Sequence, residues 1–146
     1  MKIVLANDHH GIDLKGRIIS YLNSKNIEYI NLGFDKKNNV DYVDYAKLLC
    51  ECIKDGKADY GILICGTGIG MSIALNKMKG IYCAKVSNPS EATLCKAHNN
   101  ANCIAISEEM SEDILEEVLN NFINTPFSNV NKYVSRNNKI KERENG

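Results

Sequence analysis

The chain has 146 residues, of which 44% are hydrophobic and 25% are charged, the balance of a globular protein of about one domain. Its 18 basic residues equal its 18 acidic residues, so net charge favours neither nucleic acid nor a membrane surface as a partner. The apolar run at residues 2–7 is too short for a signal peptide or a membrane span. We therefore expect a single cytoplasmic domain over residues 1–146.

Short apolar runs alternate with amphipathic stretches along the chain. Strands are expected at residues 2–7, 28–32, 60–65, 81–86 and 102–106. Helices are expected at residues 12–22, 42–53, about 70–80, 89–98 and 111–123, and a polar loop at residues 33–41. Ser111 is the expected N-cap of the last helix. Strands alternating with helices predict βαβ units, a parallel sheet and a doubly wound three-layer α/β/α sandwich.

The end of the chain, from about residue 128 to residue 146, is polar and rich in Lys, Arg and Asn. It has too few apolar residues to pack alone, which leaves two interpretations. It is either a disordered tail or a helical arm that docks on another subunit.

A glycine-rich loop follows the expected strand at residues 60–65. In open parallel sheets, ligands bind beyond the carboxyl ends of the strands. The loop lacks the lysine of a Walker A motif, and it does not follow the first strand, as the dinucleotide fingerprint does. Its backbone N–H groups, at the start of a helix, can hold a phosphate or an oxyanion, and a tight turn without a ligand is the alternative. The candidate binding residues are Gly66, Thr67, Gly68, Ile69 and Gly70.

Cys65 stands where this strand meets the loop. A thiol near a helix N-terminus ionises more readily, and its thiolate can act as a general base; a buried structural cysteine is the alternative. Five further cysteines occur without a C-x-x-C pair or a secretory signal, so we expect reduced thiols rather than disulfides. We interpret these five as small core residues: Cys50, Cys52, Cys83, Cys95 and Cys103.

The three histidines are His9, His10 and His98. A metal site of Asp8, His9 and His10 is conceivable, but adjacent histidines on an extended strand end point to opposite sides, so we expect no metal. Asp8 and His9 are interpreted instead as hydrogen-bond partners of ligand hydroxyl groups. His98 is either a general acid–base group or a helix C-terminal residue that the helix dipole favours.

Several segments, taken together, carry a family resemblance. They are Asp8-His9-His10-Gly11, Leu14-Lys15, Asp41-Tyr42, Gly61-Ile62-Leu63-Ile64-Cys65-Gly66-Thr67-Gly68-Ile69-Gly70, Asn76-Lys77 and His98-Asn99-Asn100-Ala101-Asn102. In this order they resemble ribose-5-phosphate isomerase type B, a family that includes the subunits of galactose-6-phosphate isomerase. The similarity runs from residue 1 to about residue 127.

The resemblance implies a Rossmann-like fold with a five-stranded parallel sheet, and homodimers or homotetramers whose active sites form between subunits. It implies interconversion of ribose 5-phosphate and ribulose 5-phosphate through an ene-diolate, without a metal or an organic cofactor. By the same resemblance, Cys65 moves the substrate proton, and His98, supplied by a partner chain, opens the furanose ring. The residues implied in substrate binding are Asp8, His9, Tyr42, Asn99 and the glycine loop.

Two departures from the family pattern concern the phosphate. Where the family usually has an Arg-His-x-x-Arg run, this chain has Lys132, Tyr133 and Arg136, and Glu109 stands where an arginine is expected. We expect Lys132 and Arg136, with His9, to bind the phosphate, although a lysine lacks the bidentate fork of arginine. The alternatives are an isomerase of a hexose 6-phosphate, such as galactose 6-phosphate or allose 6-phosphate, and a non-catalytic sugar-phosphate-binding subunit.

Overall fold

The computed structural model describes residues 1–33 and 41–144. Within them, a sheet of five strands has the order β2-β1-β3-β5-β4, and every neighbouring pair is parallel. The strands are β1 (Lys2–Asn7), β2 (Glu28–Asn31), β3 (Tyr60–Cys65), β4 (Cys83–Lys85) and β5 (Cys103–Ser107). The prediction of a five-stranded parallel sheet is confirmed.

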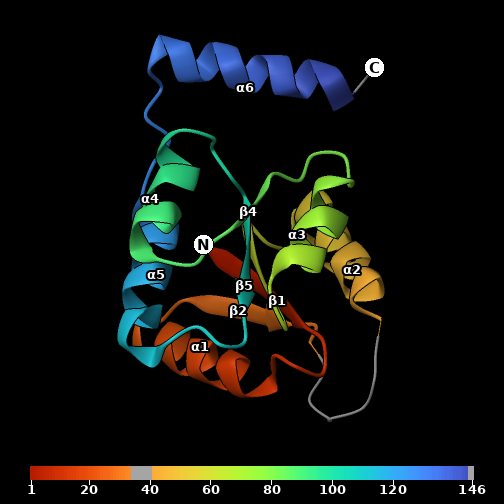
Figure 1. Cartoon of the computed structure of the whole chain (residues 1–146), viewed down its shortest axis with the longest axis vertical. Helices are drawn as coiled ribbons and strands as arrows, with labels where there is room; N and C mark the ends of the chain where they lie inside the picture. The colour runs from red at the N-terminus through yellow and green to blue at the C-terminus, as the bar shows by residue number, and fades with distance from the viewer. Residues whose placement is uncertain (34–40, 145–146) are drawn as a thin grey trace.

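Helices cover both faces of this sheet (Figure 1). They are α1 (Ile12–Ser24), α2 (Tyr42–Lys54), α3 (Ile69–Asn76), α4 (Pro89–Ala97), α5 (Glu112–Asn124) and α6 (Asn131–Glu144). One face is packed by α1, α4 and α5, and the other by α2 and α3, which gives the predicted three-layer α/β/α sandwich. Among the described residues, no helix combines the length and the apolar character needed to cross a membrane.

The central strands are buried on both faces, which explains their continuous apolar sequences. Successive side chains of a strand point to opposite faces. In β3, Ile62 and Ile64 therefore pack toward α1, α4 and α5, whereas Leu63 packs toward α2 and α3. The register of the strands continues this alternation, since Ile62 pairs with Ile104 of β5. The sheet is thus a rigid frame for the loops at its two edges.

Most predicted boundaries lie within two residues of the observed ones. The exception is α3, which ends at Asn76 rather than near residue 80. The Asn76 side chain accounts for this early end, because its Nδ2 donates to the carbonyl oxygen of Cys83 at 2.8 Å and its Oδ1 accepts from the Cys83 N–H at 2.8 Å. The predicted loop at residues 33–41 falls almost wholly outside the described residues.

Residues 131–144 form α6, so a disordered tail is the wrong interpretation for this part of the chain. None of the residues of α6 is buried, and the helix lies beyond the amino ends of the strands, at the top of Figure 1. A cavity of about 630 Å³ lies between α6 and the body, lined among others by Tyr60, Asn102 and Val134. The arm is therefore ordered but leaves a large gap beneath it.

Candidate active site

The glycine-rich loop joins the end of β3 to the start of α3. Gly68 is the N-cap of α3 and has a φ of +83°, in the left-handed region that disfavours other residues. A Cβ atom on Gly68 would lie 3.1 Å from the carbonyl carbon of Ile106 in β5. Both constraints favour glycine at this position, where the loop turns into the helix close to the backbone of β5.

The thiol of Cys65 is buried at the head of this loop, with 5% of the residue exposed. Its Sγ accepts a hydrogen bond from the Gly68 N–H at 3.1 Å. The end of β5 holds the loop from the other side, because Ser107 Oγ donates to the carbonyl oxygen of Gly66 at 2.7 Å and the Glu108 N–H donates to that of Cys65 at 2.9 Å. No local sequence pattern predicted a role for Ser107, because these bonds depend on strand register.

Tyr42 lies against the same loop. Asp41 caps α2 by accepting the Val43 N–H at 2.9 Å, so the helix begins at Tyr42. A Cβ atom on Gly70 would lie only 2.8 Å from Cζ of Tyr42, which means that the ring occupies the space that this glycine leaves. The structure therefore brings Tyr42 and the glycine loop together.

Asp8, His9 and His10 form a turn after β1, beside the loop. The His10 N–H donates to Oδ1 of Asp8 at 2.9 Å, and Oδ2 of Asp8 lies 3.5 Å from Nδ1 of His10. The expectation that the two histidines point to opposite sides is wrong: their ring centroids are 3.9 Å apart. The reason is that the chain turns here, with the Gly11 N–H bonded to the Asp8 carbonyl oxygen, rather than remaining extended.

His98 follows α4 as its C-cap residue, at the amino end of β5. Its ring stacks on Tyr133 of α6, with centroids 4.2 Å apart and an interplanar angle of 15°. Asn137 Nδ2 donates to the His98 carbonyl oxygen at 2.8 Å, and Asn99 Nδ2 donates to Asn137 Oδ1 at 3.4 Å. Asn137 is a contact that the sequence analysis missed, because its partner is distant along the chain.

The two cations predicted to bind phosphate lie close to His98. Lys132 Nζ lies 5.0 Å, and Arg136 Cζ 6.0 Å, from the ring centroid of Tyr133, on which His98 stacks. Both side chains are exposed on α6. The structure therefore gathers His98, Asn99, Lys132 and Arg136 into one group, which we name the amino-edge cluster.

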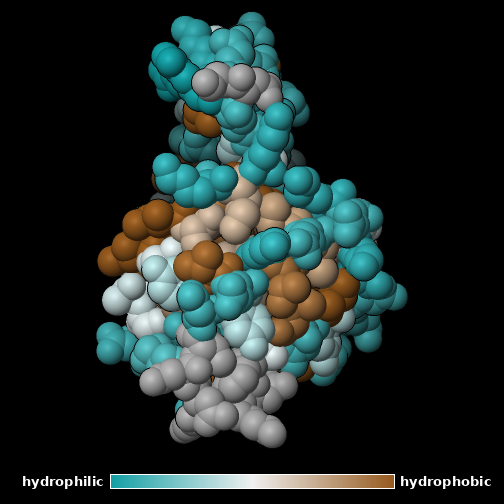
Figure 2. All heavy atoms as spheres, turned by 90° about the vertical axis from the view of Figure 1, so that its right-hand side faces the viewer, coloured by the Kyte–Doolittle hydropathy of each residue, from teal (hydrophilic) through white to brown (hydrophobic). Residues whose placement is uncertain are grey.

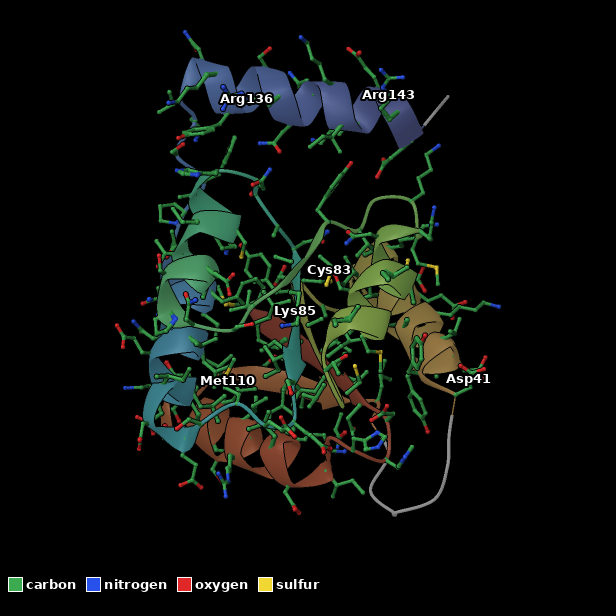
Figure 3. The ribbon with its side chains drawn as sticks, in the orientation of Figure 1. Asp41, Cys83, Lys85, Met110, Arg136 and Arg143 are labelled. Carbon is green, nitrogen blue, oxygen red and sulfur yellow. The ribbon has the colours of Figure 1, made fainter. Side chains whose placement is uncertain are left out.

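The remaining predicted residues form a second group at the other end of the strands. This carboxyl-edge cluster consists of Asp8, His9, Tyr42, Cys65, Gly66, Thr67, Gly68, Ile69 and Gly70. Parallel strands place all their carboxyl ends at one edge of the sheet, so a single chain does not bring Cys65 and His98 together. Figure 3 shows the separation: Arg136 lies on α6 at one end of the molecule, and Asp41, which precedes Tyr42, lies at the other.

The other cysteines are less suited to proton transfer. Burial raises the pKa of the Cys83 thiol to about 12, that of Cys95 to about 11 and that of Cys103 well above its usual value. All six thiols are free, and these three lie in or against the core. Their packing agrees with the interpretation of these cysteines as structural residues.

Comparison with known proteins places this arrangement in a family. Residues 3–140 match the sequence profile described as ribose/galactose isomerase. The chain belongs to the ribose/galactose isomerase family. A putative sugar phosphate isomerase of Bacillus subtilis is 38% identical, over 99% of this chain and 97% of that protein. Ribose-5-phosphate isomerase B of Escherichia coli is 38% identical, over 75% of this chain and 73% of that protein.

Solved structures of the family share the whole fold. Ribose-5-phosphate isomerase B of Clostridium thermocellum superposes with a TM-score of 0.94 at 36% identity, covering 99% of this chain and 98% of that one. The Mycoplasma genitalium enzyme, solved with bound ribulose-5-phosphate, gives a TM-score of 0.91 at 33% identity, covering 99% and 96%. The predicted family, the Rossmann-like fold and the enzyme class of aldose–ketose isomerase are confirmed.

Glu109 lies beside the carboxyl-edge cluster. Glu109, which stands where an arginine was expected, lines a cavity of about 340 Å³ together with His9, His10 and Glu108. The cavity adjoins the carboxyl-edge cluster, since His9 belongs to both. This side of the site therefore presents carboxylates rather than a guanidinium group.

Proposed function

We propose that this chain interconverts ribose 5-phosphate and ribulose 5-phosphate. The observation that carries the proposal is the Cys65 thiol at the head of the glycine loop, with Tyr42 against the same loop. Asp8 is close by, because its N–H donates to the carbonyl oxygen of Ile64, the residue before Cys65, at 3.3 Å. The bound ribulose-5-phosphate of the Mycoplasma genitalium relative adds support, because that protein shares the fold over nearly the full chain.

In the proposed reaction, the Cys65 thiolate removes the proton from C2 of the open-chain aldose. The C–H electron pair becomes the C1–C2 double bond of the ene-diolate, and the aldehyde oxygen takes the negative charge. A proton then passes from the C2 oxygen to the C1 oxygen, and the Cys65 thiol returns its proton to C1. The sum is an aldose converted into a ketose, with the thiolate regenerated.

The ene-diolate charge needs hydrogen-bond donors in the loop. Two N–H groups of the predicted set are already engaged, since that of Gly68 binds the Cys65 sulfur and that of Ile69 binds Thr67 Oγ1 at 3.1 Å. The N–H groups of Gly66, Thr67 and Gly70 are the ones we assign to the oxyanion. Of these three residues, Gly70 lies in the first turn of α3, where backbone N–H groups have no partner within the helix, and Gly66 and Thr67 lie in the loop before it.

A second copy of the chain completes the proposed site. His98 and the phosphate-binding cations Lys132 and Arg136 lie at the amino edge, so in a homodimer the amino edge of one protomer meets the carboxyl edge of its partner. Exposed apolar residues occur on the helices that flank the glycine loop, on the face shown in Figure 2: Val43 and Leu48 of α2, and Ile69 and Ile73 of α3. This surface is where we place the contact between the two copies.

Isomerisation of a hexose 6-phosphate is the second candidate function. Glu109 favours this candidate, because a carboxylate beside His9 and His10 repels a phosphate from that position. A hexose phosphate has one more carbon, so its phosphate must lie farther from the reacting carbons. The two candidates share the chemistry at Cys65 and differ only in the distance between the reacting carbons and the phosphate.

A coupled assay with three substrates tests the proposal. We expect turnover of ribose 5-phosphate to exceed that of allose 6-phosphate and galactose 6-phosphate, and Cys65→Ala to lower kcat by about 10²–10⁴-fold, the usual contribution of a general base. Preference for a hexose phosphate would favour the second candidate. Absence of activity on all three sugars, with sugar phosphate still bound, would favour a non-catalytic binding subunit.

A further inference from the structure

The turn at Asp8, His9 and His10 offers a set of metal-binding atoms that the proposed isomerisation does not need. Among the described residues, one ligand atom from each of the three side chains lies within 4.8 Å of the other two. Two imidazoles and a carboxylate are a donor set that suits Zn²⁺ and similar divalent transition metals. Three protein donors leave the fourth position of a tetrahedral site open.

The distances fit such an ion after a small movement. Zn–N and Zn–O bonds of about 2.0–2.2 Å in a tetrahedron hold neighbouring donor atoms about 3.4 Å apart. Oδ2 of Asp8 and Nδ1 of His10 already lie 3.5 Å apart. The His10 side chain is 45% exposed, so its ring can rotate without disturbing the core. Asp8 is held in place, because its Oδ1 accepts the His10 N–H at 2.9 Å.

His9 provides a second, independent observation. Its Nδ1 is buried and has no hydrogen-bond partner among the described residues. A buried polar atom without a partner carries a free-energy cost that a bound ligand can remove. Nδ1 of His9 is therefore not engaged by another described residue, and the ring lies 3.9 Å, centroid to centroid, from that of His10.

The surrounding charge also favours a cation. The cavity of about 340 Å³ beside the two histidines is lined by the carboxylates of Asp13, Glu108 and Glu109. A cavity of this size admits a hydrated ion, and the carboxylates raise the local concentration of cations. Glu109 contributes to this field from a position where an arginine would oppose it.

We propose that Asp8, His9 and His10 bind a divalent transition metal such as Zn²⁺, and that the bound ion excludes the sugar phosphate. The ion and the sugar compete because both need Asp8 and His9. The metal is therefore an inhibitor of the enzyme rather than a cofactor. The exclusion step rests on the proposed function, whereas metal binding itself does not.

Co²⁺, which replaces Zn²⁺ and absorbs visible light, tests the binding. We expect the full-length protein to bind Co²⁺ with nitrogen and oxygen ligands. His10→Ala should weaken binding by at least about 100-fold, because loss of a residue that only hydrogen-bonds a metal ligand weakens binding by at most about 100-fold. His98→Ala is the matched control, because it removes the one histidine outside the turn and should leave binding unchanged. Equal binding by wild type and His10→Ala, no binding, or a thiolate-to-cobalt absorption band would overturn the proposal.

Competition tests the exclusion step with two readouts. Ribulose 5-phosphate should displace Co²⁺ from the wild-type protein, while inorganic phosphate at the same concentration should not. In the isomerase assay, Zn²⁺ should raise KM without changing kcat, and His10→Ala should escape this inhibition. If the protein binds metal through His10 but isomerises none of the sugars, the proposed function is rejected and the metal site stands. Simultaneous binding of Co²⁺ and ribulose 5-phosphate would reject the exclusion.

Discussion

His98 is fixed by a hydrogen bond to its backbone and by stacking against the face of its ring. Asn137 binds its carbonyl oxygen at 2.8 Å, and Tyr133 stacks on the ring at 4.2 Å. Among the described contacts, none engages the ring nitrogens, which leaves them available to a substrate. This way of fixing a histidine suits a group that must exchange protons with a ligand rather than with the protein.

A prediction at the residue scale concerns ring opening. We expect His98→Ala to lower kcat/KM on the cyclic sugar phosphate by about 10²–10⁴-fold, because an acid–base group is lost. The loss on the open-chain form should be much smaller, since that form needs no ring opening. Stopped-flow measurements that separate the cyclic pool of the sugar from its open-chain pool check this difference. Equal losses on both forms would contradict the assigned role.

The residues of the two clusters could be predicted singly, but the contacts that hold them could not. Cys65 and His98 belong to continuous segments with a family resemblance. Ser107 and Asn137 act through partners that are 41 and 39 residues away. Their hydrogen bonds depend on strand register and on the position of the arm, which a local pattern does not encode.

At the scale of single elements, the start of α3 is the most constrained point of the site. The chain must pass from β3 through a left-handed residue into a helix, while β5 holds the loop at Gly66 and Cys65. The glycine spacing predicted this strand–loop–helix unit correctly. The end of the same helix was predicted too late, because the Asn76 side chain bonds the backbone of Cys83 and the helix ends at this residue.

Two alanine substitutions make a matched test of this constraint. Gly68→Ala should destabilise the protein by about 1–3 kcal/mol, because φ at this position is positive and the added Cβ meets the backbone of β5. Gly16→Ala, in α1, should stabilise it by about 0.5–1 kcal/mol, because alanine loses less conformational entropy than glycine in a helix and a Cβ there meets nothing within 4 Å. Urea unfolding measures both changes. A neutral Gly68→Ala would show that the loop can take another path.

At the scale of the whole molecule, the amino-edge and carboxyl-edge clusters lie at opposite ends of the strands of one sheet, and we propose that each is half of a site. The parallel topology itself fixes this separation, because every strand runs in the same direction. The alternation of strands and helices was enough to predict the sheet and its layers. The placement of α6 was not predictable from composition, because few of its residues are apolar and none is buried in the chain.

Mixing two inactive variants tests whether the half-sites combine between subunits. A homodimer of Cys65→Ala lacks Cys65 in both of its sites, and a homodimer of His98→Ala lacks His98 in both. A mixed dimer regains one intact site of two, so an equilibrated equal mixture should recover about one quarter of wild-type activity, since half of the dimers are mixed. Activity after co-refolding, against each variant refolded alone, is the measurement. No recovery would place Cys65 and His98 of the same chain in one site.

The arm α6 leaves a cavity of about 630 Å³ beneath it and buries none of its own residues. If a second copy of the chain packs against α6, the enzyme is active only as a dimer, and a folded single chain is inactive. Dilution would then lower the rate per molecule before any chain unfolds. A substitution in α6 would then change the activity of the partner's active site rather than that of its own chain. Selection would act on the two ends of the sheet together, although they belong to different molecules.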